Sequence, residues 1–209
     1  MNCDSIARAY RWLEYLAFGR ALERRRFHFL AEAAGARRAL VLGDGDGRFL
    51  GRFSAISNAC IDYVDLSARM LELARKRGGA RRVVYRQADA LTLPLAPAEY
   101  DLIATHFFLD CLNERDLEAL IERAARTAQP GALWLISEFR QPSWAAPLLS
   151  VLYLFFRVTT GLTTRRLTDH RPLLAKQGFR LTQEETSRLG LLASELWVRE
   201  TCTFDVTRL

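Results

Sequence analysis

Short apolar runs alternate along the chain with segments whose apolar residues recur at helical spacing. Strands are expected at residues 39–42, 59–65, 83–85, 100–106 and 132–139, followed by an antiparallel pair near 180–186 and 195–204. Helices are expected at residues 48–56, 66–75 and 114–128, with a short one that ends at Gly178. Strands that alternate with helices indicate an α/β fold with a doubly wound, mostly parallel sheet.

A glycine-rich turn follows the first expected strand. Four apolar residues, Ala39 to Leu42, lead into Gly43-Asp44-Gly45-Asp46-Gly47, and a helix is expected to begin just after this loop. Because glycine has no Cβ, the loop backbone can approach a ligand closely. The first N–H groups of the helix would face the same ligand. The stretch predicts a site for a nucleotide-type ligand.

The loop lacks the features of a phosphate site. A dinucleotide fingerprint that starts at Gly43 needs a third glycine at position 48, which is Arg48. A P-loop needs a Gly-Lys-Ser or Gly-Lys-Thr ending, and the loop has none. Asp44 and Asp46 also put carboxylates where a pyrophosphate would lie. We therefore expect the loop to favour a positively charged group such as an amine or a sulfonium.

Two further acids follow expected strands. Asp65 ends the second strand, 22 residues after Gly43 (65 − 43), close to the interval of about 20 residues at which a ribose-binding acid follows the first glycine of such a loop. Asp89 follows the third strand. Taken singly, the loop is more often a simple turn, Asp65 a helix cap and Asp89 a solvated carboxylate. Their order at the ends of three successive strands favours one shared ligand site.

Three segments resemble class I S-adenosylmethionine-dependent methyltransferases of the small-molecule, quinone-biosynthesis type. They are Leu40-Val-Leu-Gly-Asp-Gly-Asp-Gly, Val64-Asp-Leu-Ser-Ala-Arg-Met-Leu-Glu-Leu-Ala-Arg and Gln87-Ala-Asp-Ala, and the resemblance covers most of the chain. It implies a Rossmann-like, seven-stranded, mostly parallel sheet with helices on both faces, an antiparallel last strand and an N-terminal helical cover. It also implies S-adenosylmethionine as cofactor and transfer of its methyl group to a small molecule by in-line displacement.

The resemblance also assigns roles to residues. In the family the first loop contacts the methionine part of the cofactor, the acid after the second strand binds the ribose, and the acid before the fourth strand addresses the adenine amine. These roles fall to Gly43, Asp44 and Gly45, to Asp65, and to Asp89. Additional cofactor contacts are expected near these positions, at the end of the fourth strand and in the N-terminal segment: Leu66, Met70, Ala90, Thr105 and Tyr10.

One position departs from the family pattern. The family often has an acid near the end of the first strand, where this chain has Val41, and we expect Asp44 to take over part of that role. Two alternatives therefore stay open. The glycine-rich loop also resembles that of spermidine synthases, which would make the chain an aminopropyl transferase. The chain could also be a non-catalytic, cofactor-binding partner subunit.

The N-terminal segment from Ser5 to about Ala34 is expected to form one or two helices. We expect a single domain, in which residues 1–36 form a helical cover and residues 37–209 form the α/β core. A cover before the first strand can close over a ligand, and Tyr10 is the candidate to reach the cofactor or substrate, although helix packing explains this residue equally well.

In-line methyl transfer does not require a catalytic base, because positioning and exclusion of water supply much of the rate. If a base acts, His106 at the end of the fourth strand is the first candidate, followed by Asp110 and His170. A lone histidine is nevertheless more often a packed residue. The apolar stretch Trp144 to Phe156 is expected to form a substrate-side helix and suggests a hydrophobic small molecule as substrate, although core packing explains it as well.

Composition narrows the remaining classes. Apolar residues make up 50% of the 209 residues, enough for one large core. No run of 18 apolar residues and no signal peptide is present, so we expect a cytoplasmic protein without a transmembrane segment, although peripheral membrane contact stays open. The net charge of +6 is dispersed along the chain, which makes nucleic-acid binding a minority interpretation. The four scattered cysteines indicate free thiols and no metal site. The oligomeric state is left open.

Overall fold

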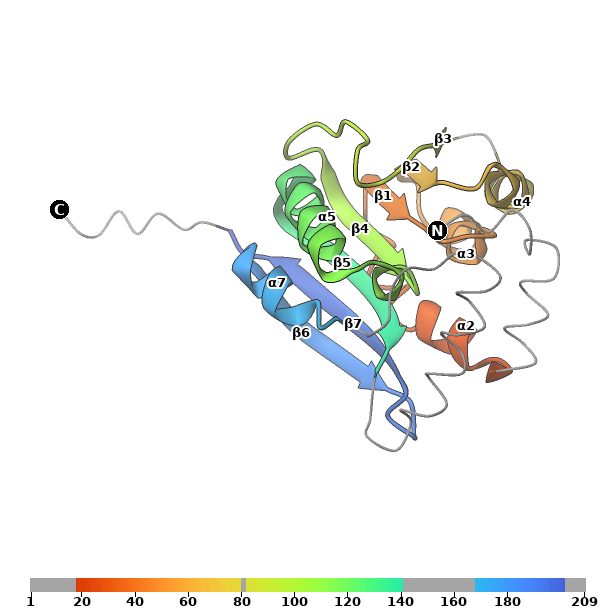
Figure 1. The fold of residues 1–209 in the computed structure, drawn as a ribbon. Coiled ribbons are helices and arrows are strands. Elements are labelled where there is room, and N and C mark those ends of the chain that lie inside the picture. Colours follow the sequence, from red (N-terminus) through yellow and green to blue (C-terminus); the bar gives the residue numbers. More distant parts are fainter. Residues whose placement is uncertain (1–17, 80–81, 141–167, 202–209) are drawn as a thin grey trace.

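The computed structural model describes residues 18–79, 82–140 and 168–201. Seven strands form one sheet in the order β3-β2-β1-β4-β5-β7-β6 (Figure 1). Their bounds are β1 Arg38–Leu42, β2 Cys60–Asp65, β3 Val83–Gln87, β4 Tyr100–His106, β5 Ala128–Phe139, β6 Phe179–Thr186 and β7 Leu192–Arg199. The first five strands pair in parallel, whereas β7 runs antiparallel to both β5 and β6. The predicted Rossmann-like, seven-stranded α/β fold is confirmed.

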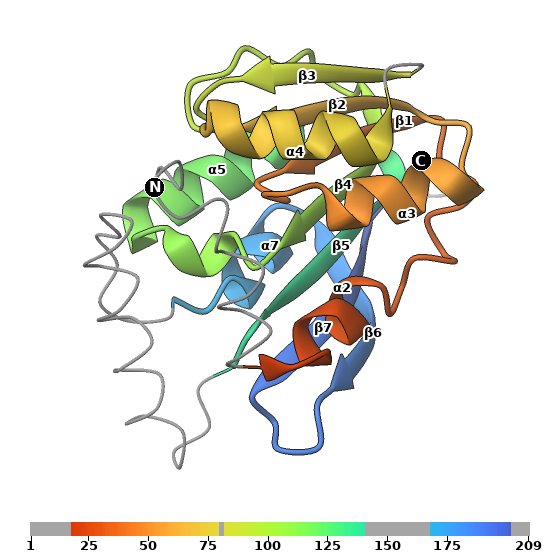
Figure 2. The ribbon, with the colours of Figure 1, turned by 90° about the vertical axis from the view of Figure 1, so that its right-hand side faces the viewer.

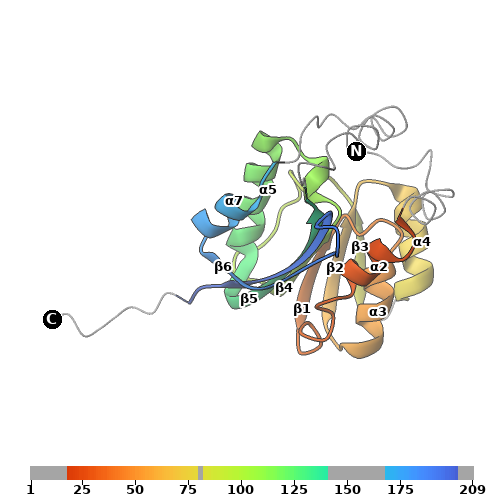
Figure 3. The same ribbon diagram turned by 90° about the horizontal axis from the view of Figure 1, so that it is seen from below.

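Helices cover both faces of this sheet. Seen from below, α2, α3 and α4 lie on one face, and α5 and α7 lie on the other (Figure 3). Turned to its side, the molecule presents α3 and α4 in front of the sheet (Figure 2). The bounds are α2 Ala21–Arg26, α3 Arg48–Ile56, α4 Ala68–Gly78, η1 Leu109–Cys111 (a 3-10 turn), α5 Glu114–Thr127 and α7 Arg171–Lys176. Coverage on both faces explains why the central strands read as continuous apolar runs.

Alternate residues of the central strands build two separate cores, because successive side chains of a strand point to opposite faces. Leu40 and Leu42 of β1 join the core under α5 and α7. Ala39 and Val41, from the same strand, join the core under α3 and α4. The face on which a strand residue lies therefore follows from whether its position is odd or even. The same rule decides below which polar residues reach a cavity.

The strands β5 and β7 differ most from the sequence prediction. β5 begins at Ala128, ahead of the expected residue 132, because Ala128 pairs with Tyr100 before an irregularity shifts the register to Leu102 and Leu133. A bulge of this kind lets Pro130 and Gly131 lie within the strand instead of forming a separate loop. β7 runs from Leu192 to Arg199 instead of from about 195, since it pairs antiparallel with β5 from Phe139 onward.

Helix α2 is the described part of the predicted N-terminal cover. The hydroxyls of Ser137 on β5 and Ser194 on β7 both donate hydrogen bonds to the backbone carbonyl of Arg25, at 3.0 and 2.7 Å. These bonds fix α2 to the sheet. Tyr10 and the apolar stretch 144–156 lie outside the described residues, and the division into a cover and a core stays a prediction. In the part of the chain that the structure describes, no helix is long and apolar enough to cross a membrane.

Candidate functional site

A cavity of about 260 Å³ opens where the carboxyl ends of β1 and β2 meet the segment that follows β4. This edge is where parallel α/β sheets bind ligands. The lining combines the glycine loop, the ends of β2 and β3 and the segment after β4: Gly43, Gly45, Val64, Asp65, Leu66, Met70, Ala88, Asp89, Ala90, Leu91, Phe107, Phe108, Cys111, Leu112 and Asp116. Seven of the predicted cofactor contacts are therefore together in one cavity: Gly43, Gly45, Asp65, Leu66, Met70, Asp89 and Ala90.

The glycine loop presents its backbone to this cavity. Gly43 and Gly45 adopt φ values of +64° and +63°, in the left-handed region that glycine tolerates best. A Cβ on Gly43 would lie 2.3 Å from Cδ2 of Phe108, so the ring of Phe108 packs directly on the loop. A Cβ on Gly45 would meet only the sulfur of Met70 at 4.0 Å. The space over Gly45 is therefore open for a ligand.

Asp44 differs from its prediction. Its side chain does not line the cavity and is buried on the protein side of the loop. Its Oδ2 accepts a hydrogen bond from the N–H of Leu50 at 3.1 Å, and its Oδ1 lies 3.8 Å from Nε of the buried Arg26. Burial raises the pKa of Asp44 to about 6, an effect that the charge of Arg26 partly offsets. Asp44 thus fastens the loop to α3 and does not present its charge to a ligand.

Asp46 is turned inward as well. Its carboxylate pairs with Arg48 at 2.9 Å and with Arg77 at 2.6 Å. Burial opposes the charged form, but the two arginines lower the pKa of Asp46 overall. The expectation that the loop's acids attract a cationic ligand is therefore not met, because both carboxylates are neutralised by arginines inside the protein. The glycines face the cavity and the acids face the core.

Asp65 lies at the cavity edge where β2 ends. Its Oδ1 accepts a hydrogen bond from the N–H of Ser67 at 2.8 Å, and the hydroxyl of Ser67 caps α4 by accepting from the N–H of Met70 at 3.1 Å. Ser67, and not Asp65, is therefore the N-cap of α4. The short β2–α4 connection fixes Asp65 and brings Leu66 and Met70 to the cavity wall.

A second carboxylate, Asp89, borders the cavity after β3. Its Oδ1 accepts a hydrogen bond from the N–H of Leu91 at 2.9 Å, which orders the turn that also carries Ala90. Asp65 and Asp89 are thus two hydrogen-bond acceptors on a lining that also contains Leu66 and Leu91. This lining fits a nucleoside. The carboxylates can accept hydrogen bonds from its hydroxyls and exocyclic amine, and the leucines can pack against the flat, apolar faces of its base.

Thr105 and His106 do not line the cavity, although both stand at the end of β4. The hydroxyl of Thr105 accepts a hydrogen bond from Nε1 of Trp134 at 3.0 Å inside the core under α5. The side chain of His106 points to the other face, where its ring lies 4.6 Å from that of Phe49. This placement does not support the predicted cofactor contact of Thr105, because neighbouring core residues cover both side chains.

The hydrogen bonds of His106 define its state. Its Nδ1 lies 3.0 Å from the hydroxyl of Ser137, which already donates its own proton to the carbonyl of Arg25. Nδ1 therefore carries the ring proton, and Nε2 has no hydrogen-bond partner among the described residues. Burial, and secondarily the charge of Arg26, hold the pKa of His106 well below its usual value. His106 is a neutral buried histidine, and the structure offers no support for it as a base.

The other two base candidates, Asp110 and His170, line a second cavity together with Glu138. Sequence analysis did not single out Glu138, although a carboxylate inside an apolar strand is a visible signal. Cys111, Leu112 and Asp116 of the first cavity were missed as well. They follow the irregular segment after β4, and no pattern in the sequence marks them.

Comparisons with known proteins agree with this geometry. A family described as "Methyltransferase domain" matches residues 39–131. The ubiquinone/menaquinone biosynthesis C-methyltransferase UbiE of Saccharophagus degradans is 33% identical over 175 residues, which cover 78% of this chain and 69% of that protein. The protein of the same name from Shewanella halifaxensis is 32% identical over 123 residues, 54% of this chain and 48% of that protein. The chain thus spans about half the length of the first curated relatives it matches.

Solved structures share the fold. The N-methyltransferase NodS from Bradyrhizobium japonicum, in complex with S-adenosyl-l-homocysteine, superposes with a TM-score of 0.67 at 13% identity, over 87% of this chain and 89% of that one. A methyltransferase from Mesorhizobium loti gives 0.67 at 18% identity, over 88% and 98%. The [4+2]-cyclase SpnF gives 0.66 at 17% identity, over 83% and 79%.

A cyclase among these structures means that the fold alone does not specify methyl transfer. The sequence relationship is more specific, since the 33% identity to the Saccharophagus protein extends over more than two thirds of both chains. It also favours the methyltransferases over the aminopropyl transferases that the glycine loop left open. The chain belongs to the family of S-adenosylmethionine-dependent methyltransferases.

Proposed function

We propose that the chain transfers the methyl group of S-adenosylmethionine to a small, hydrophobic molecule. The observation that carries the proposal is the 260 Å³ cavity, in which the carboxylates of Asp65 and Asp89 flank an open glycine loop. Bound there, S-adenosylmethionine would supply the methyl group of its sulfonium to a nucleophile of the acceptor, with S-adenosylhomocysteine as the leaving group. The names of the relatives, C-methyltransferases of quinone biosynthesis, support an apolar acceptor.

The residues of the cavity would hold the cofactor in distinct ways. Asp65 would accept hydrogen bonds from the ribose hydroxyls, and Asp89 from the adenine amine. Leu66 and Met70 would pack against the adenosine, and the backbone of Gly45 would lie against the methionine part. Phe108, which packs on Gly43, helps exclude water from the reacting methyl group.

Calorimetric titration with S-adenosylmethionine and with S-adenosylhomocysteine tests the cofactor site. The wild-type chain should bind both, and Asp65→Asn should weaken binding by about tenfold or more, because the amide offers one acceptor in place of a charged carboxylate. Glu72→Gln is the matched control, since Glu72 is exposed on the helix that follows Asp65 and does not line the cavity. Binding of neither ligand by the wild-type chain would contradict the proposal.

A third titration addresses the aminopropyl alternative. Decarboxylated S-adenosylmethionine lacks the carboxylate of the methionine part, so a methyltransferase should bind it more weakly than S-adenosylmethionine. Preference for the decarboxylated form would instead support aminopropyl transfer. Binding of the cofactor without methylation of any apolar acceptor in a broad screen would favour a partner subunit.

A further inference from the structure

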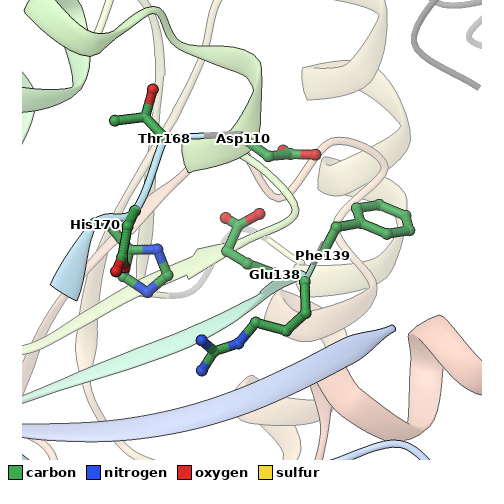
Figure 4. Close-up of a pocket in the computed structure, with 7 residues that line it drawn as sticks. Asp110, Glu138, Phe139, Thr168 and His170 are labelled. Atoms are coloured by element: carbon green, nitrogen blue, oxygen red, sulfur yellow. The ribbon is translucent and has the colours of Figure 1, made fainter. Parts of the chain in front are cut away.

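A second cavity, of about 150 Å³, lies at the end of β5 beside the start of α7. Its lining is unusually polar: Asp110, Glu138, Phe139, Arg140, Thr168, Asp169 and His170 (Figure 4). Asp110 belongs to the same short segment as Phe107, Phe108 and Cys111, which line the cofactor cavity. One segment thus contributes to both cavities, so a ligand in the second cavity would adjoin the cofactor site.

Glu138 is the central residue of this second cavity. Its side chain is 3% exposed, and its Oε1 accepts hydrogen bonds from the N–H groups of Phe108 and Leu109 at 3.0 and 2.8 Å. Its Oε2 is buried and has no hydrogen-bond partner among the described residues. The carboxyl group points into the space between Asp110 and Thr168 (Figure 4). The neighbouring polar group is the carboxyl of Asp110, with which Glu138 interacts, and a hydroxyl group placed between the two carboxyls would give Oε2 a hydrogen bond.

The surroundings of Glu138 favour its protonated form. Burial raises the pKa of Glu138 well above its usual value, and the nearby charge of Asp110 raises it further. Two interacting carboxyl groups favour the singly protonated state, because the charge of one disfavours ionisation of the other. The neighbouring Arg140 does not change this, because it pairs with Glu184 and Glu195, and His170 shares a hydrogen bond with Glu195 at 2.8 Å. Asp169 lies at the exposed edge.

We propose that this cavity binds an uncharged hydroxyl group of the methyl acceptor, with Glu138 donating a hydrogen bond to its oxygen and Asp110 accepting one from its proton. The inference rests on the proposed function, because it takes the neighbouring cavity as the cofactor site. A hydroxyl group offers one donor and accepting lone pairs, and a singly protonated carboxyl pair supplies the complementary acceptor and donor. The hydroxyl group itself brings no charge into the cavity.

The dimensions suit a small ring that bears this hydroxyl. Complete ligand sites usually measure about 300–1,000 Å³, so the second cavity can hold only part of an acceptor. A cavity of about 150 Å³ is large enough for a benzene ring. A carboxylate would add a further negative charge beside Asp110 and Asp169, and an ammonium would have to lose most of its hydration.

Four matched probes test the proposal on protein saturated with S-adenosylhomocysteine: 4-methylphenol, toluene, benzylamine and benzoate. They share one ring and differ in the group it carries. Binding is measured by calorimetry and by ligand-observed NMR. We expect 4-methylphenol to bind about tenfold or more tightly than toluene, because only the phenol satisfies the carboxyl pair. Equal or tighter binding of benzylamine or benzoate would overturn the proposal.

Variants of the pair sharpen the test. Asp110→Asn should weaken the binding of 4-methylphenol about tenfold, since a charged acceptor is lost. The affinity of Glu138→Gln for 4-methylphenol should stay within about threefold of wild type, because the amide N–H replaces the acid O–H. Glu138→Leu has no such donor and should lose about as much affinity as Asp110→Asn. Glu122→Gln, an exposed glutamate on α5, is the control. Equal affinities for all four variants would contradict a recognition role for the pair.

An infrared measurement reads the proton directly. At pH 7.5 the wild type should show the carbonyl band of a protonated carboxyl group, which Glu138→Gln removes and Glu122→Gln retains. 4-Methylphenol should shift this band, and its absence in the wild type would overturn the proposed donor. Failure of S-adenosylhomocysteine to bind the wild type would instead contradict the proposed function, so the two outcomes are separable.

Discussion

His106 and Glu138 occupy similar places in the chain and opposite places in the molecule. Each lies at the carboxyl end of a central strand, and each is only 3% exposed. His106 points to the face under α2 and α3 and is closed over by Phe49, whereas Glu138 points to the face under α5 and α7 and lines a cavity. Burial lowers the pKa of His106 and raises the pKa of Glu138, so in both residues it favours the neutral form. The comparison teaches that the face of the strand decides which residue reaches a ligand.

The largest expected difference between the two residues is in folding stability. Glu138→Ala removes the acceptor of two buried backbone N–H groups, on Phe108 and Leu109, and should lower the free energy of unfolding by about 3 kcal/mol. Glu138→Gln keeps an acceptor oxygen and should cost less than about 1 kcal/mol. Urea denaturation measures both variants. Equal losses would mean that the two N–H bonds are not what Glu138 contributes.

The pH dependence of stability should have opposite signs for the two residues. Because the pKa of His106 is lowered, the unfolded chain binds its proton first, and stability falls as the pH drops below 6.5. Because the pKa of Glu138 is raised, the folded chain holds its proton, and stability falls as the pH rises above 4.5. Each contribution is limited to about 1.4 kcal/mol per pH unit.

Difference curves between wild type and single variants isolate the two contributions. Unfolding free energies of wild type, His106→Leu and Glu138→Gln between pH 4.5 and 6.5 should give differences of opposite slope. Asp44, whose pKa is raised to about 6, contributes to all three curves and cancels in the differences. Slopes of the same sign would contradict the assignment of one residue.

Thr105 sharpens the comparison, because it shares a face with Glu138 and still reaches no cavity. Its hydroxyl is the acceptor for Nε1 of Trp134. Thr105→Val leaves this buried donor unpaired and should destabilise the fold by about 1–2 kcal/mol. Affinity for S-adenosylhomocysteine should stay within about twofold, a change of about 0.4 kcal/mol. A large loss of cofactor affinity would contradict this prediction and would indicate that Thr105 belongs to the cofactor site.

The smallest effect is expected for His106→Leu at neutral pH. The substitution removes an unpartnered Nε2 and the bond from Nδ1 to Ser137, but the hydroxyl of Ser137 keeps its own bond to the carbonyl of Arg25. Stability should change by less than about 1 kcal/mol, and methyl transfer to any identified acceptor should be unchanged. A strong loss of turnover with intact folding would restore His106 as a base candidate.

The sequence predicts the site best at positions that local backbone geometry determines, such as glycines in a tight turn and acids at strand ends. The glycine loop, Asp65 at the end of β2 and Asp89 after β3 lie together at the cavity, as predicted. Their positions follow from local rules, since a parallel strand places its carboxyl end at the same edge as its neighbours. The strand order is consistent with the same pattern, and the boundaries of β5 and β7 moved most among the strands.

Side-chain direction was the weaker part of the prediction. Asp44 and Asp46 turned inward because arginines from α2, α3 and α4 surround them, a long-range arrangement that sequence spacing does not reveal. For His106, counting alternate positions from the apolar residues Leu102 and Ala104 would have placed it on the face under α3. Glu138 lies on the opposite face by the same count, together with Trp134 and Ile136.

The two serine bonds to Arg25 also bear on how the chain folds. Ser137 and Ser194 are separated from Arg25 by 112 and 169 positions in the sequence. During synthesis, α2 emerges early but cannot complete its attachment until residue 194 has left the ribosome, and contacts of such long range form late. The first described helix is thus among the last elements to complete its attachment to the sheet.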